Sequence, residues 1–297
     1  MSKSLHVAEG DVAVCLPADK CRVNKTLRGA QGFEAYYAEL YNARWQQLKA
    51  ALLRSPRYIT WTSGGTEPYF LDSASLYAAL MLPLSDAKRI LDLCAAPGGK
   101  TLVLASRMDG DAVLTANELS AARYCRLVNV LNSCLPESVR MRVQTTKSNG
   151  AKMCLKCTEQ YERILLDVPC SSERHVLADK KYLLQWSSAR IKTVSMEQWA
   201  LLSSAYRMLA SGGYILYSTC ALSPAENDAQ IERLLVKFDS AVCVRKEDFS
   251  KSAIERAAQL CGISFEAVEK TAYGFHILPD VHNGAGPIYF SLIRKLS

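Results

Sequence analysis

The stretch Leu91-Asp-Leu-Cys-Ala-Ala-Pro-Gly-Gly-Lys-Thr101 joins a short apolar run to a glycine-rich turn and then to a segment of helical pattern. Gly98 and Gly99 have no Cβ atom, so the backbone of this turn can approach a bound molecule closely. In open α/β sheets, ligands bind beyond the carboxyl ends of the strands, where this turn would lie. Its spacing matches neither the GxxxxGK[ST] phosphate loop nor the GxGxxG dinucleotide motif. We therefore expect a small-molecule site at residues 94–100; the alternative is a strand-to-helix turn without a ligand.

Short apolar runs and longer helical segments alternate on both sides of this stretch. Such alternation implies right-handed crossover connections and a mostly parallel sheet that helices cover on both faces. The expected strands are residues 89–93, 112–116, 139–143, 163–167 and 214–218, and the expected helices are residues 101–107, 121–132, 196–209 and 224–238. The pattern predicts a doubly wound α/β fold.

The carboxyl-terminal part of the chain has a different pattern. Residues 274–278 and 288–294 read as two strands, and the Pro- and Gly-containing segment between them is too short for a crossover helix. These two strands should form an antiparallel hairpin at the edge of the sheet. A mixed sheet of about seven strands with such a hairpin is typical of a Rossmann-like class I methyltransferase rather than a dehydrogenase.

The amino-terminal part is expected to be mainly helical. Apolar and aromatic residues recur at intervals of three and four over residues 33–53, which predicts an amphipathic helix that ends at Arg54-Ser-Pro56. A turn-rich segment with Gly64, Gly65 and Pro68 leads to a short approach and helix over residues 69–80. We expect an amino-terminal extension over residues 1–80 and the main domain over residues 81–297.

The bulk composition limits the possible partners and compartments. The formal net charge of +7 is compatible with a nucleic-acid partner but does not establish one. No apolar run is long enough for a membrane helix, so we expect no membrane partner. Eleven cysteines, an odd number, without a secretory signal indicate reduced thiols and a cytoplasmic protein, with an organelle matrix left open. Cys154 and Cys157 have the spacing of half a zinc site, but a matching second pair is missing, so we expect no metal.

Two further cysteines follow predicted strands directly. Cys170 lies in Asp167-Val-Pro-Cys-Ser171, and Cys220 lies in Tyr217-Ser-Thr-Cys-Ala-Leu-Ser-Pro-Ala-Glu-Asn227. A thiolate is a strong nucleophile, although buried cysteines are more often structural.

Glu118 follows the second strand of the main domain, where a carboxylate can accept hydrogen bonds from a ribose diol; a surface acid near a helix start is the alternative.

These three motifs, in this order, resemble the Nop/Sun family of S-adenosylmethionine-dependent RNA cytosine-C5 methyltransferases. The resemblance continues through residues 33–45, 70–76 and 286–290, so it covers roughly residues 33–295. Residues 167–175 are most similar to the small organelle-type branch, which methylates ribosomal or transfer RNA.

The resemblance implies a role for each motif residue. Cys220 would be the nucleophile, Cys170 would help to release the product, and Asp167 would line the cofactor and cytosine pocket. Asn149 stands where the family usually has an aspartate that contacts the adenine amino group, and its amide oxygen can still accept that hydrogen bond. The other residues expected to bind S-adenosylmethionine are Cys94, Ala95, Ala96, Pro97, Gly98, Gly99, Lys100 and Glu118.

The chemistry explains why such a site needs a nucleophile. Attack of a thiolate at carbon 6 of cytosine makes carbon 5 enamine-like, which divides one difficult step into easier ones. The base must be presented unpaired or flipped out of a helix. Arg174 and His175, just past Cys170, are expected to contact RNA, unless they are only solvated loop charges. Lys20, Arg22, Lys25 and Arg28 are further candidates for an RNA surface.

The sequence thus predicts an RNA cytosine-C5 methyltransferase that acts on ribosomal RNA, with transfer RNA as the alternative substrate. Asn149 also leaves room for a non-catalytic RNA-binding factor in ribosome assembly. A DNA cytosine methyltransferase is a third interpretation, but those enzymes use the Pro-Cys thiol as nucleophile, and the Ser-Thr-Cys motif points away from it. A protein partner is possible and unidentified.

Overall fold

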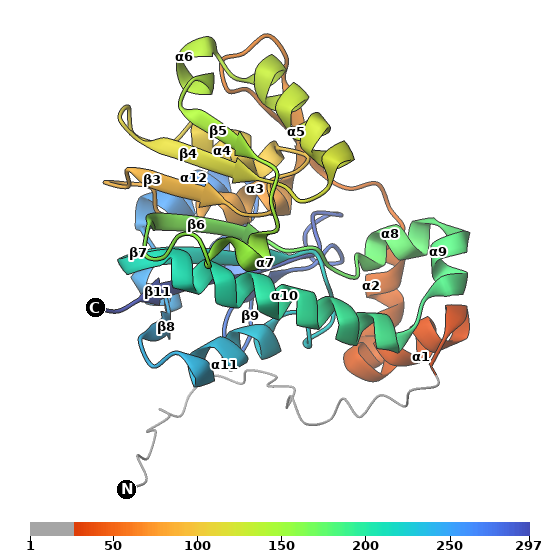
Figure 1. Ribbon diagram of the computed structural model, residues 1–297. Helices are drawn as coiled ribbons and strands as arrows, with labels where there is room; N and C mark the ends of the chain where they lie inside the picture. The colour runs from red at the N-terminus through yellow and green to blue at the C-terminus, as the bar shows by residue number, and fades with distance from the viewer. Residues whose placement is uncertain (1–26) are drawn as a thin grey trace, which may run out of the picture.

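The computed structural model describes residues 27–297, so the basic residues Lys20, Arg22 and Lys25 lie outside the described part. A nine-stranded mixed sheet forms its centre (Figure 1). The strand order is β5-β4-β3-β6-β7-β11-β10-β9, with β8 beside β11. The strands are β3 (Arg89–Asp92), β4 (Val113–Asn117), β5 (Val143–Thr146), β6 (Tyr161–Asp167), β7 (Leu209–Thr219), β8 (Ala241–Cys243), β9 (Glu269–Lys270), β10 (Phe275–Ile277) and β11 (Ile288–Lys295).

The sheet changes from parallel to antiparallel at β11. The pairs from β5 to β7 are parallel, whereas β11 runs antiparallel to both β7 and β10. The class I methyltransferase fold and the terminal hairpin are confirmed. The sheet has two more strands than expected because β8 and β9 contribute only three and two residues, too few to give an alternating pattern.

Two hydrophobic cores cover the two faces of the sheet. Successive strand residues point to opposite faces, so Leu165 joins one core while Ile164 and Leu166 join the other. The first core includes residues of α3 (Ser73–Leu80), α4 (Gly99–Ala105), α5 (Ala121–Cys134) and α12 (Lys251–Cys261), and the second includes residues of α10 (Ser188–Met208) and α11 (Asp228–Lys237). In Figure 1, α10 and α11 lie on the opposite side of the sheet from α3 and α12.

The order in which successive strands are added to the sheet reverses between the parallel neighbours β3 and β6. From β3 the strand order runs outward through β4 and β5 on one side, and through β6 and β7 on the other. Crossovers that leave on opposite faces open a crevice beyond the carboxyl ends of the two central strands. The glycine-rich turn follows β3 and the Asp167 motif follows β6, so both predicted motifs meet at this crevice.

The amino-terminal helices form a third hydrophobic cluster. Helices α1 (Gly29–Tyr41) and α2 (Trp45–Leu52) surround an aromatic group that includes Phe33, Trp45 and Trp186. The single helix expected over residues 33–53 is wrong, because Asn42 adopts a left-handed φ of 49° and the 3-10 turn Asn42–Arg44 follows it. Beyond α2, the antiparallel hairpin of β1 (Tyr58–Trp61) and β2 (Tyr69–Asp72) was not predicted.

Packing is continuous across residue 80, where the main domain was expected to begin. Ala74, Leu76, Tyr77, Leu80 and Leu82 all belong to the core on one face of the sheet. Helix α3 is therefore packed as part of the sheet structure, whereas α1 and α2 pack with residues 176–191.

One expected strand is partly a helix. Residues 139–143 were expected to be extended, but α6 (Glu137–Arg140) precedes β5, which begins at Val143. Pro136 at the helix start and Glu137 in the first turn favour a helix there and outweigh the apolar alternation. The remaining helical elements are α7 (Gly150–Met153), α8 (Glu173–Ala178), α9 (Lys180–Gln185) and the 3-10 turns Lys246–Asp248 and Phe265–Ala267. Among residues 27–297, no helix is long and apolar enough to cross a membrane.

Candidate active site

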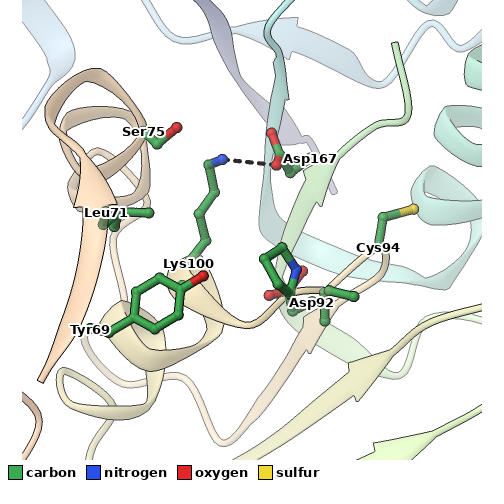
Figure 2. A pocket seen from close by; sticks show the side chains of 11 residues that line it. Tyr69, Leu71, Ser75, Asp92, Cys94, Lys100 and Asp167 are labelled. Atoms are coloured by element: carbon green, nitrogen blue, oxygen red, sulfur yellow. Dashed lines mark hydrogen bonds and ion pairs between the residues drawn. The ribbon is translucent and has the colours of Figure 1, made fainter. Parts of the chain in front are cut away.

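A cavity of about 170 Å³ lies at the crevice between β3 and β6 (Figure 2). The hairpin strand β2 and helix α3 form one wall, and the glycine-rich turn and Asp167 form the rest. The lining residues are Tyr69, Leu71, Ser75, Asp92, Cys94, Ala95, Ala96, Pro97, Gly99, Lys100 and Asp167. The turn predicted to hold a small molecule thus contributes most of one wall.

The turn requires a glycine at each of the two positions 98 and 99, for a different structural reason in each case. Gly98 has a φ of 122°, which side chains rarely tolerate, and it immediately precedes α4. A Cβ atom on Gly99 would lie 2.6 Å from the Tyr69 ring. Gly98 therefore makes the turn, and Gly99 allows the turn to pack closely against Tyr69 and Leu71 of β2.

Lys100 and Asp167 form an ion pair inside the cavity. Figure 2 shows Lys100 extending from α4 to Asp167, with Nζ and Oδ2 2.8 Å apart. The other carboxylate oxygen accepts a hydrogen bond from Ser218 Oγ at 2.7 Å, which ties the end of β6 to β7. Burial acts to lower the pKa of Lys100, but the Asp167 carboxylate outweighs it and raises that pKa. Lys100 is therefore a cation at neutral pH.

Asp92 is a site residue that the sequence motifs did not indicate. It ends β3, is almost fully buried, and accepts a hydrogen bond from Thr101 Oγ1 at 2.7 Å. Its second oxygen, Oδ1, has no hydrogen-bond partner among the described residues. Burial raises the pKa of Asp92 to about 7, despite the hydrogen bond from Thr101. Its place at the end of a buried strand, two residues before Cys94, was the available signal.

Glu118 follows β4 and Asn149 follows β5, the next two strands of the sheet, and neither residue is among those that line the cavity. Glu118 is buried; its Oε1 accepts the Ser120 amide, and its Oε2 lies 3.5 Å from Arg123 without a hydrogen bond. A buried carboxylate oxygen with a free lone pair suits a ribose diol. Asn149 is exposed, and its Oδ1 accepts the Ala151 amide at the start of α7, so this oxygen already has one donor. Together with the glycine-rich turn, these acceptors fit a nucleoside-containing cofactor.

The two motif cysteines lie side by side. Their Sγ atoms are 2.8 Å apart, because parallel strands β6 and β7 end at the same edge of the sheet. The hydrogen bond with Cys220, followed by burial, raises the pKa of the Cys170 thiol well above its usual value. Cys170 therefore keeps its proton at neutral pH and can donate it in a hydrogen bond to the Cys220 sulfur.

Two buried glutamates hold the cysteine loops together. Glu226 accepts the Ser171 amide at 2.9 Å and the Gln198 side chain at 3.0 Å, and Glu173 accepts the Leu222 amide at 3.0 Å. Glu173 also accepts hydrogen bonds from the Ser171 and Tyr37 hydroxyls. Burial, then the charge of Glu173, raises the pKa of Glu226 to about 7. Neither glutamate was predicted, since acidic residues in a polar loop motif carry no sign of burial.

Arg174, which was expected to contact RNA, has a structural role in the fold, and its contact with RNA stays a prediction. Its five N–H groups all donate to backbone carbonyl oxygens, those of Leu52, Arg54, Gly284 and Gly286. Arg174 therefore fastens α8 to the end of α2 and to the loop before β11. His175 is exposed and lies with its ring centre 4.9 Å from that of Tyr182. Its contact with RNA stays a prediction.

The sheet topology, the glycine-rich cavity beyond β3 and the acidic residue after β4 define a Rossmann-like class I methyltransferase. Residues 79–293 match the family model described as 16S rRNA methyltransferase RsmB/F. The chain belongs to this family, and the resemblance inferred from its motifs is confirmed.

Curated relatives agree with this assignment, and a solved structure shares the fold. The 5-cytosine rRNA methyltransferase NSUN4 of Xenopus laevis is 32% identical over 78% of this chain and 57% of its own length. The mitochondrial tRNA (cytosine(34)-C(5))-methyltransferase of Danio rerio is 30% identical over 77% of this chain and 60% of its own length. The chain therefore spans less than two thirds of these relatives. A methyltransferase homologue from Pyrococcus horikoshii has the same fold, with a TM-score of 0.64 at 20% identity over 89% of this chain and 94% of that one.

Proposed function

We propose that this protein is an RNA cytosine-C5 methyltransferase that uses S-adenosylmethionine and acts on ribosomal RNA. The contact between Cys170 and Cys220, with sulfur atoms 2.8 Å apart, carries the proposal. Two unequal thiols at the ends of adjacent strands suit a reaction in which one sulfur bonds the base and the other assists its release. The Asp167 and Lys100 pair lies at the end of the same strand as Cys170.

The cofactor supplies an electrophilic methyl group on a sulfonium when it is bound. The described residues that would hold it are the turn 94–100, Glu118 at the ribose and Asn149 near the adenine. Asp92 and Asp167 place carboxyl groups in the same cavity, where Lys100 is paired with Asp167.

Cys220 is the nucleophile of this proposal because its Ser-Thr-Cys motif resembles the nucleophile motif of the family. The Cys220 thiolate forms a bond to carbon 6, and the electron pair of the 5,6 double bond becomes available at carbon 5. Carbon 5 would then accept the methyl group that the cofactor supplies when it is held by the turn 94–100. The carbon 5 proton is then lost to water, the double bond re-forms, and the carbon 6–sulfur bond breaks to return the Cys220 thiolate, which accepts a hydrogen bond from Cys170 as it leaves. Asp167 would bind the polar edge of the cytosine and promote the first attack.

Incorporation of labelled methyl groups into RNA tests the proposal. The purified chain should methylate ribosomal RNA in the presence of labelled cofactor, and Cys220→Ser should abolish this activity. Bisulfite sequencing of RNA from cells with and without the gene should identify the modified cytosine. Absence of any incorporation would favour the non-catalytic RNA-binding alternative that Asn149 raises.

Transfer RNA is the second candidate substrate, because one relative is a transfer RNA methyltransferase by name. Equal amounts of purified ribosomal and transfer RNA in the same assay separate the two proposals. The cytoplasmic location stays a prediction as well, and cell fractionation tests it.

A further inference from the structure

The Ser172 hydroxyl lies beside both motif cysteines. Ser172 Oγ is 3.3 Å from Cys220 Sγ and 3.4 Å from Cys170 Sγ. Both distances are within reach of a hydrogen bond to sulfur. The two thiols and this hydroxyl therefore form a triangle of mutually contacting groups.

The backbone of Ser172 is unusual for a residue with a side chain. Its φ of 54° and ψ of 62° place it in the left-handed region, which costs energy for any residue other than glycine. Ser172 also directly precedes α8, a position where serine commonly accepts a hydrogen bond from the helix amides. Here its side chain makes no such bond. The strained conformation and the missing cap both leave the hydroxyl facing the sulfur atoms.

The residues on either side hold this conformation in place. The Ser171 amide is fixed by Glu226, and Glu173 is fully buried with its carboxylate bound to the Leu222 amide. Because both neighbours are anchored, Ser172 cannot relax without breaking buried hydrogen bonds. The position of its hydroxyl is therefore preorganised.

We propose that Ser172 is a third catalytic residue, whose hydroxyl donates a hydrogen bond to the Cys220 thiolate. This inference rests on the proposed function in that Cys220 is the nucleophile. A hydrogen bond from a neutral donor to a charged sulfur stabilises the thiolate and increases its fraction at neutral pH. Cys170 donates to the same sulfur, so the thiolate has two donors. The hydroxyl keeps its proton throughout, and the same bond receives the sulfur when it leaves carbon 6.

Other charged groups around Cys220 also act on its thiolate. Lys100 on α4 and Arg174 on α8 interact with its charge, and Cys170 hydrogen-bonds to it. Glu226 acts on the neighbouring Cys170. All four groups remain unchanged when only residue 172 is substituted, so a change in Cys220 reactivity then reports on the hydroxyl.

Two substitutions separate the hydroxyl from the backbone. Ser172→Gly removes the hydroxyl and relieves the left-handed strain, so it should fold at least as stably as the wild type. Ser172→Ala removes the hydroxyl and keeps the strain. If the hydroxyl matters, both variants change Cys220 in the same direction although their stabilities differ. Asp86→Gly is the matched control, since exposed Asp86 has a similar φ of 61° in the turn before β3, at the opposite end of that strand from the cavity.

The measurement is the pH dependence of Cys220 alkylation by iodoacetamide in the free protein. Cys170 and Cys220 fall on different tryptic peptides, so mass spectrometry follows each thiol separately. We expect the midpoint for Cys220 to move up by roughly one pH unit in both Ser172 variants, the size of one charge-assisted hydrogen bond. The midpoint should not move in Asp86→Gly. Methyl transfer at pH 7 should fall about tenfold in both Ser172 variants and recover at higher pH.

An unchanged midpoint in folded Ser172→Gly and Ser172→Ala would overturn the proposal and leave Ser172 a structural residue. Because alkylation needs neither RNA nor cofactor, it tests the hydrogen bond even if the wild type transfers no methyl group. A shifted midpoint without methyl transfer would support the hydrogen bond and contradict only the proposed function.

Discussion

Cys170 and Cys220 have different chemical roles in this account although their sulfur atoms touch. The difference comes from what surrounds each of them. Cys170 is held in the protonated form by its hydrogen bond to Cys220 and by burial. The Cys220 sulfur contacts the Ser172 hydroxyl and the Cys170 sulfur, both of which can donate to a thiolate, and its charge interacts with the Lys100 cation. The role of each cysteine therefore depends more on the hydrogen bonds available to its sulfur than on which motif comes first in the sequence.

Glu226 should make stability depend on pH. Its pKa rises from 4.5 to about 7 on folding because it is buried beside Glu173. The folded state then holds a proton that the unfolded state releases, so the free energy of unfolding should fall as pH rises from about 4.5 to 7. Asp92 acts in the same direction. Glu226→Gln, which keeps the shape and the acceptor oxygen, should reduce this slope in urea titrations at several pH values. An identical slope in wild type and variant would contradict a buried, protonated Glu226.

Arg174 should matter for stability rather than for RNA binding. Arg174→Lys keeps the charge but cannot supply five donors in a fixed plane, so several partly buried carbonyls lose their partners. We expect a loss of about 2–4 kcal/mol in the free energy of unfolding. His175→Ala, one residue along on the exposed side of α8, should change it by less than about 0.5 kcal/mol. If Arg174→Lys were as stable as the wild type but bound RNA more weakly, Arg174 would be an RNA contact, as the sequence predicted.

Among the elements, the glycine-rich turn gives the sharpest test. Gly99→Ala places a Cβ atom against the Tyr69 ring, and the ring can move only by reshaping the cavity wall. Affinity for S-adenosylmethionine, measured by calorimetry, should fall about tenfold or more while the fold is kept. Gly110→Ala is the control, because a Cβ atom there has nothing within 4 Å and the φ is ordinary. Equal affinities in the two variants would show that the cavity is not the cofactor site.

The sequence predicted most elements of the main domain because their apolar periods are regular and long. Its errors have local causes. Asn42 breaks a continuous helical pattern with one left-handed residue, and Pro136 starts a helix inside an apparent strand. The β1–β2 hairpin lies in a turn-rich region whose alternation is short. These features depend on single residues or tertiary contacts, which a periodic pattern does not contain.

The whole molecule explains why the site could be only partly predicted. Cys94 to Lys100, Asp167, Cys170 and Cys220 stand in contiguous motifs, so spacing alone drew attention to them. Asp92, Glu173, Glu226 and Ser172 acquire their properties from burial, strain or contact between loops about 50 residues apart. Arg174 is the reverse case, since a charged loop residue became a structural one when α2 and the loop before β11 packed against it.

The amino-terminal helix α1 contacts the residues that hold the two cysteine loops. Tyr37 donates to Glu173, and Tyr41 donates to the Leu222 carbonyl at 3.0 Å, so both tyrosines on α1 contact the residues that hold the cysteine loops. Phe33 and Trp45 pack with Trp186 in the same cluster. The amino-terminal helices therefore help to fix the positions of the two thiols, in addition to any contact with RNA.

The proposed mechanism depends on Cys220 as the nucleophile and Cys170 as the residue that assists release. Covalent trapping tests this most directly: Cys170→Ser, Cys220→Ser and the double variant are incubated with ribosomal RNA and S-adenosylmethionine and analysed on denaturing gels. This mechanism predicts a stable protein–RNA adduct for Cys170→Ser and none for Cys220→Ser or the double variant. An adduct formed by Cys220→Ser and absent from Cys170→Ser would contradict it and reverse the two roles.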